Sequence, residues 1–213
     1  MKGIFISIEG MDGSGKTTMT NKIVEYLESK GYEVLRTREP GGTVVSEKIR
    51  SIIIKNEMLP MTEFLLFAAS RYEHTETVIK PALEAGKIVV CERYTDSSIA
   101  YQGYGRNLTE GPIREISKIF LNGFKPDHTF FFNVPYEVSQ QRTGSRGEAR
   151  DRFENEHKEF FCAAQRGFMS CLMEDRDRFI YISGNKPLDE VWKSVRSNLD
   201  TRVLARPAGI PTE

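Results

Sequence analysis

The feature that most constrains this chain is the run at positions 10–17, GMDGSGKT, which fits the phosphate-loop pattern G-x-x-x-x-G-K-[ST]. The pattern is informative only between a strand and a helix. Residues 3–9 (GIFISIE) form an apolar run typical of a buried strand, and residues 17–30 have helical apolar spacing that ends before Gly31. Because both neighbours fit, we expect this segment to bind the phosphates of a nucleoside triphosphate.

The glycines of this loop let successive backbone N–H groups point at phosphate oxygens, and the start of the next helix adds positive potential. Lys16 is expected to reach the terminal phosphates, and the Thr17 hydroxyl to bind a magnesium ion that arrives with ATP. A carboxylate repels phosphate, so Asp12 is expected to point away from the bound phosphates. The residues of this segment expected to bind ATP are Gly10, Met11, Asp12, Gly13, Ser14, Gly15, Lys16, Thr17 and Thr18.

Composition narrows the class of protein. The 213 residues suit one domain, and 30 basic against 30 acidic side chains leave no net charge to attract a nucleic acid. No apolar run approaches the ~18 residues that cross a bilayer, and no signal peptide precedes the first strand. We therefore expect a cytoplasmic protein that binds neither nucleic acid nor membrane.

Cysteine and histidine usage argues against a metal site built by the protein alone. The three cysteines show no C-x-x-C pairing, and the three histidines show no ligand spacing. Magnesium bound together with the nucleotide is the better expectation.

Strand-like and helical segments alternate along the chain. The expected strands are 3–9, 33–37, 87–91, 129–134 and 179–182, and the expected helices are 17–30, 44–55, 62–85, 112–122, 135–142, 155–175 and 188–199. This alternation predicts a three-layer α/β fold of the P-loop NTPase type, with a five-stranded parallel sheet flanked by helices. We expect one domain over residues 1–200, a polar and mobile lid segment at about 142–154, and a flexible C-terminal tail at 201–213.

Ligands of such sheets bind beyond the carboxyl ends of the strands, so the segments that follow strands are site candidates. These include R-E-P-G-G-T at 38–43, E-R-Y at 92–94 and an arginine-rich run at 142–152. With L-L-F-A-A-S-R at 65–71 and S-S-I-A-Y-Q-G at 97–103, they make the chain resemble the bacterial thymidylate kinases, a family of P-loop nucleoside monophosphate kinases. The resemblance runs to about residue 195. It implies transfer of the γ-phosphoryl group of ATP to thymidine monophosphate (dTMP) for dTTP synthesis, with Mg²⁺, in a homodimer.

The resemblance also assigns a nucleobase pocket. Phe67 and Arg71 lie four residues apart on a predicted helix, so a flat ring and a planar guanidinium share one face. By resemblance, Phe67 stacks on thymine and Arg71 binds its carbonyl edge. The same resemblance implies that Ser97, Ser98, Tyr101 and Gln102 close the pocket. The simpler interpretation makes Phe67 a core residue and Arg71 a surface charge.

The remaining assignments concern the acceptor phosphate and the metal. Arg93 matches the family arginine that holds the acceptor phosphate, a role suited to bidentate hydrogen bonds; a strand-end salt bridge is the alternative. Glu39 and Pro40 are expected to line the acceptor cleft, and Asp12 to meet the sugar 3′-hydroxyl. Glu92 is expected to assist Mg²⁺, although the family commonly has the shorter aspartate there, which leaves the metal geometry open.

The phosphate loop has no arginine at its variable positions, so by resemblance the catalytic arginine comes from the lid. Arg146 and Arg152 are the best matches, and Arg142 is assigned to ATP binding. A solvated basic loop is the alternative.

Two other functions remain possible on the sequence. A deoxyribonucleoside kinase would share E-P and E-R motifs but needs a general base such as Glu39 to activate a 5′-hydroxyl. A monophosphate is already largely ionised at neutral pH, and residues 41–43 and 101–103 favour it. A GTPase switch would need D-x-x-G after the third strand, where this chain has ERYT.

Overall fold

The structure is a computed structural model that describes residues 3–144, 153 and 156–205. Its centre is a five-stranded sheet in the order β2-β3-β1-β4-β5, in which every neighbouring pair is parallel. The strands are β1 (Ile4–Gly10), β2 (Val34–Arg38), β3 (Ile88–Glu92), β4 (His128–Asn133) and β5 (Phe179–Ser183). The predicted five-stranded parallel sheet is therefore confirmed, with strand ends displaced by at most one residue.

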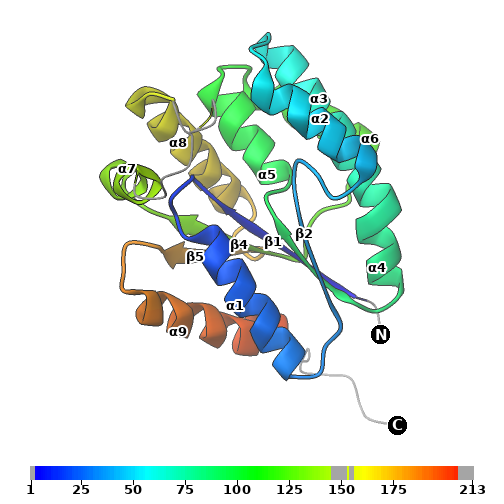
Figure 1. The fold of residues 1–213 in the computed structure, drawn as a ribbon, viewed down its shortest axis with the longest axis vertical. Coiled ribbons are helices and arrows are strands. Elements are labelled where there is room, and N and C mark those ends of the chain that lie inside the picture. Colours follow the sequence, from blue (N-terminus) through cyan, green and yellow to red (C-terminus); the bar gives the residue numbers. More distant parts are fainter. Residues whose placement is uncertain (1–2, 145–152, 154–155, 206–213) are drawn as a thin grey trace.

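Helices connect the strands and cover both faces of the sheet, as Figure 1 shows. They are α1 (Lys16–Ser29), α2 (Val44–Lys55), α3 (Pro60–His74), α4 (Lys80–Glu84), α5 (Thr95–Ser98), α6 (Glu110–Leu121), α7 (Tyr136–Gly144), α8 (Lys158–Glu174) and α9 (Leu188–Asn198). Three π-helical segments extend them, namely η1 (Thr75–Ile79), η2 (Ile99–Gly105) and η3 (Leu199–Val203). None of these described helices is both long and apolar enough to span a bilayer.

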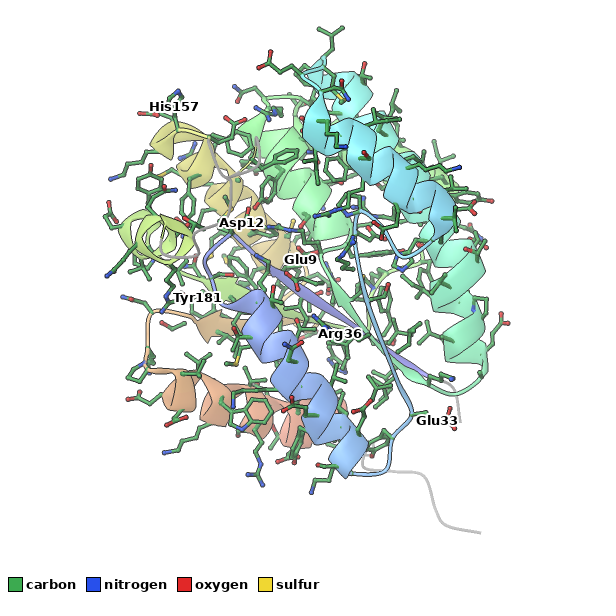
Figure 2. The ribbon with its side chains drawn as sticks, in the orientation of Figure 1. Glu9, Asp12, Glu33, Arg36, His157 and Tyr181 are labelled. Atoms are coloured by element: carbon green, nitrogen blue, oxygen red, sulfur yellow. The ribbon has the colours of Figure 1, made fainter. Side chains whose placement is uncertain are left out.

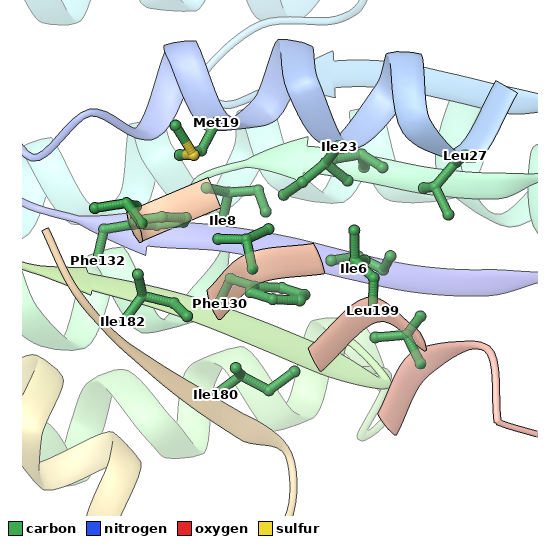
Figure 3. Close-up of a cluster of buried hydrophobic side chains, with 14 of the residues drawn as sticks. Ile6, Ile8, Met19, Ile23, Leu27, Phe130, Phe132, Ile180, Ile182 and Leu199 are labelled. Carbon is green, nitrogen blue, oxygen red and sulfur yellow. The ribbon is translucent and has the colours of Figure 1, made fainter. Parts of the chain in front are cut away.

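Alternation along the strands divides the core into two layers because successive side chains point to opposite faces. Even-numbered residues such as Ile6 and Ile8 pack with Met19, Ile23 and Leu27 of α1 (Figure 3), and α9 completes this layer. The odd-numbered strand residues pack on the other face against α3 to α6 and α8. Both faces are buried, which explains why the central strands read as continuous apolar runs.

Two predicted segments differ from the structure. No helix was predicted for residues 95–105, yet α5 and η2 form one continuous helical run there. Gly167 lets α8 pack closely against this run, because a Cβ at that position would lie 2.6 Å from the Ala100 Cα. The predicted tail was placed too early: η3 extends to Val203, which is buried in the core, while residues 206–213 lie outside the described part.

Candidate active site

The loop between β1 and α1 has the backbone form that its glycines predicted. Gly13 has a φ of +74°, and a Cβ there would lie 2.6 Å from the Ser139 carbonyl oxygen of α7. Only glycine meets both demands without strain. The Ser139 hydroxyl donates to the Asp12 carbonyl (2.7 Å), so α7 holds the loop from one side. Arg142, also on α7, donates to the carbonyl of Gly13 (3.3 Å).

Lys16 lies under this loop and is 4% exposed. Its ammonium donates to the Met11 carbonyl (2.8 Å) and lies 3.7 Å from Oδ1 of Asp12. Burial, and next the neighbouring Arg93, lower the pKa of Lys16 to about 8. A lysine so poorly solvated gains strongly from an anion that enters the loop.

The Thr17 hydroxyl and the Glu92 carboxylate meet at the mouth of the loop. Thr17 Oγ1 lies 3.0 and 3.1 Å from the two carboxylate oxygens of Glu92. Glu92 is the last residue of β3, the strand that pairs with β1, and the extra methylene relative to aspartate does not prevent the contact. Two hard oxygen donors therefore adjoin the phosphate-binding loop, which suits Mg²⁺.

Arg93 follows β3 with a φ of +67°, a conformation that non-glycine residues rarely adopt. Its guanidinium lies 2.7 Å from Asp12 Oδ1 and 4.9 Å from the centre of the Tyr101 ring. Although burial opposes its charge, the facing Tyr101, Asp12 and Glu9 raise the pKa of Arg93 above its ordinary value. Arg93 is thus a permanent cation directed at the phosphate loop, and the alternative of a strand-end salt bridge is also realised through Asp12.

Glu9 holds the backbone beside this arginine and was not singled out in the sequence. It accepts hydrogen bonds from the Tyr94 N–H (2.7 Å) and the Ser97 hydroxyl (2.6 Å). Figure 2 shows Glu9 on β1 and Asp12 in the loop that follows it. Burial, and next the Asp96 carboxylate, raise the pKa of Glu9 to about 7. Its position inside the apolar first strand was the only signal of a buried acid.

Arg71 is 1% exposed, so its interpretation as a surface charge is wrong. Its guanidinium donates to Glu39 (2.6 Å), to the Ser98 hydroxyl (2.9 Å) and to the Tyr94 carbonyl (3.0 Å). The second oxygen of Glu39 lies 3.1 Å from Nδ1 of His74, another buried residue that the sequence did not identify. Both oxygens of Glu39 are therefore engaged, one by the Arg71 guanidinium and the other by the His74 ring.

These groups surround one cleft of about 240 Å³. Its walls include most of the predicted site residues, namely Asp12, Gly13, Gly15, Lys16, Thr17, Glu39, Pro40, Phe67, Arg71, Glu92, Arg93, Ser97, Ser98, Tyr101 and Gln102. The predicted residues Gly10, Met11, Ser14, Thr18 and Arg142 do not line it. Arg146 and Arg152, with most of the predicted lid, lie outside the described residues.

The cleft also has walls that the sequence did not indicate. Arg38 and Arg50 add cationic groups, and Ile53 and Ile54 add apolar surface from α2. Phe153 lies against both Phe67 and Tyr101, with ring centres 6.1 Å apart in each case. These side chains reach the cleft because of the way α2 and residue 153 pack against the strand ends. No local sequence motif predicts that packing.

Comparison with known proteins agrees with this site. The family model described as thymidylate kinase matches residues 8–195. A thymidylate kinase of Mesoplasma florum is 42% identical over 196 residues, covering 91% of this chain and 93% of that protein. One of Pseudomonas fluorescens is 39% identical over 212 residues, covering 98% and 100%. The crystal structure of thymidylate kinase from Ehrlichia chaffeensis superposes with a TM-score of 0.77 at 33% identity, covering 94% of this chain and all of that one. On the family match, the identities and the shared fold, the chain belongs to the thymidylate kinase family.

Proposed function

We propose that this protein transfers the γ-phosphoryl group of ATP to dTMP, giving dTDP and ADP, and that residues 1–200 act as one kinase domain. One observation carries the proposal: Lys16 of the phosphate loop, Arg93 and the Phe67–Arg71 pair line the same cleft. A donor phosphate chain at Lys16 and an acceptor phosphate at Arg93 would then meet inside it. Phosphoryl transfer depends chiefly on such positioning and on neutralising charge.

Each group has a role in this arrangement. Lys16 and the N–H groups of residues 10–18 bind the donor phosphates, and Arg93 holds the acceptor phosphate by charge-assisted hydrogen bonds. Phe67 stacks on the base while Arg71 donates to its carbonyl edge; Ser97, Ser98 and Tyr101 close the pocket, and Pro40 lines its side. Asp12 lies between Arg93 and Lys16, where the sugar 3′-hydroxyl would reach it.

Two arginine roles complete the assignment. Arg142 would help to bind ATP from α7, through its hold on the loop carbonyl of Gly13. Arg146 and Arg152 would supply the mobile positive charge that the phosphate loop lacks.

The residues present fit a magnesium ion bound with ATP. Thr17 and Glu92 would hold it, directly or through water, because their oxygens already lie side by side at the loop. When bound, the ion neutralises charge on the phosphates.

The neighbouring alternatives are less consistent with the site. A deoxyribonucleoside kinase would use Glu39 as a general base, but both of its oxygens are engaged by Arg71 and His74. The family membership favours neither this activity nor a GTPase switch. An acceptor screen with ATP and Mg²⁺ tests the proposal: dTMP should be the best acceptor and thymidine inert, whereas faster turnover of thymidine would refute it.

We also propose a cytoplasmic homodimer. Helices α3 and α6 pack together and expose large apolar side chains, including Leu65 (49%), Tyr72 (48%) and Ile119 (80%). Apolar surface of this kind marks a site of association. All three cysteines are free thiols, which suits a reducing compartment.

A further inference from the structure

Gln102 and Glu63 form a buried pair at the wall of the cleft. The Gln102 side-chain nitrogen, on η2, lies 2.7 Å from Oε1 of Glu63, on α3. Each residue is 1% exposed. Glu63 lies two turns before Arg71 on the same helix, and Ser98, which accepts from Arg71, lies one turn before Gln102. Helix α3 and the α5–η2 run therefore carry both the Glu63–Gln102 pair and the Arg71–Ser98 pair.

Glu63 dictates which end of the Gln102 amide faces it. A glutamine amide can present either its oxygen or its nitrogen, since the two are nearly the same size. A carboxylate only accepts hydrogen bonds, so the amide must present its nitrogen. Arg106 reinforces this choice because its guanidinium lies 3.4 Å from Oε2 of Glu63 and balances the negative charge.

The carbonyl oxygen of Gln102 is left as the group available to a ligand. Gln102 lines the cleft, and within residues 3–144, 153 and 156–205 no hydrogen-bond donor contacts that oxygen. Arg71, on the same wall, can only donate, and three of its five N–H groups are already engaged. The wall therefore offers a donor and an acceptor in a fixed order.

We infer that Glu63 is a positioning residue that makes the pocket selective for a 4-oxopyrimidine over cytosine; the inference rests on the proposed nucleotide acceptor. Thymine and uracil present a carbonyl oxygen and an N3–H donor, which match Arg71 and the Gln102 oxygen. Cytosine presents an amino donor and an N3 acceptor, which meet a donor and an acceptor of the wrong kind. Without Glu63, the Gln102 amide can turn over and donate to N3 of cytosine, which removes one of the two mismatches, while Arg71 still faces the amino group.

The test compares binding of dTMP and dCMP to the wild-type protein, Glu63→Gln and Glu63→Met by calorimetry without ATP. A glutamine can donate or accept, and a methionine of similar length cannot hold the amide, so both variants free Gln102. We expect the preference for dTMP over dCMP to fall by about 10- to 100-fold, with part of the change from tighter dCMP binding. A merely structural loss would weaken both ligands together.

Glu110→Gln is the matched control, because it removes a carboxylate from an arginine pair (Arg114, 3.1 Å) away from the cleft. The preference of Glu110→Gln for dTMP over dCMP should equal that of the wild type. An unchanged preference in folded Glu63→Gln overturns the inference, as does equal binding of dTMP and dCMP by the wild type, a result that needs no variant. A wild type that binds dTMP selectively yet does not phosphorylate it would refute the proposed function alone.

Discussion

Arg93 and Asp12 form an ion pair at the carboxyl end of β1 and β3, with Nη2 and Oδ1 2.7 Å apart. The same carboxylate oxygen lies 3.7 Å from the ammonium of Lys16. Asp12 thus lies between Arg93, which is assigned to the acceptor phosphate, and Lys16, which is assigned to the donor phosphates. An acceptor phosphate must therefore compete with Asp12 for Arg93.

Replacing Arg93 by alanine should abolish most acceptor use and spare ATP binding. The lost charge-assisted hydrogen bonds should lower kcat/KM for dTMP by about 100-fold or more. Steady-state kinetics with each substrate varied in turn measures this, with Arg36→Ala, an exposed strand residue, as control. A fall in ATP affinity without a fall in dTMP affinity would assign Arg93 to the donor instead.

Phe67→Ala should weaken dTMP binding through lost stacking worth about 1 to 3 kcal/mol. Arg71→Ala should weaken it too, but leaves Glu39 buried without its cation, so Phe67 is the cleaner site. Phe124→Ala is a matched control, since this partly buried ring stacks on Phe5 away from the cleft. Calorimetry that finds unchanged dTMP affinity in folded Phe67→Ala would make Phe67 a packing residue.

ATP binding should take up a proton between about pH 8 and 10. Burial and Arg93 lower the pKa of Lys16 to about 8, and the phosphates of ATP favour its charged form. The free energy of unfolding of the ATP-free protein should also increase as the pH rises through this range. The reason is that Lys16 has lost its proton in the folded state but still holds it in the unfolded state. Calorimetry in buffers of different ionisation enthalpy measures the uptake. Lys16→Met should abolish it; equal uptake in that variant would assign the proton elsewhere.

Arg146→Ala and Arg152→Ala should each lower kcat far more than they raise KM for either substrate. An arginine delivered to the transferring phosphoryl group contributes about 10³- to 10⁵-fold in turnover, and a contact made chiefly in the transition state affects kcat. Arg150→Ala removes the same charge at a neighbouring position in the sequence and serves as the control. Near-normal kcat in both single variants and in the double variant would leave Lys16 and the magnesium ion as the electrostatic catalysts.

Ile119→Glu should shift the protein from dimer to monomer in sedimentation at micromolar concentration, because it places a charge on the exposed face of α6. Leu188→Glu is the control, since Leu188 is 51% exposed on α9, which packs on the opposite face of the sheet. A wild type that sediments as a monomer would refute the proposed assembly directly.

Local pattern was enough to predict the sheet and the phosphate loop. Strand residues such as Ile6 and Val90 lie in apolar runs because parallel strands are buried on both faces. The glycines at 10, 13 and 15 all adopt positive φ, as the motif requires. The helical run at 95–105 escaped prediction because Gly103 and Gly105 argue against a helix locally, and packing against α8 decides otherwise.

The sequence by itself determined the fold class, the phosphate loop and, through its motifs, the family of this protein. Only the tertiary structure decided how the charged and polar side chains are paired: Glu39 with Arg71, Asp12 with Arg93, and Glu63 with Gln102. The reason is physical. Backbone propensity and apolar periodicity depend on residues that are close together in the sequence, so they can be recognised from the sequence alone. The two members of each of these polar pairs are 32 to 81 residues apart in the sequence. They meet only after the strands and helices have packed.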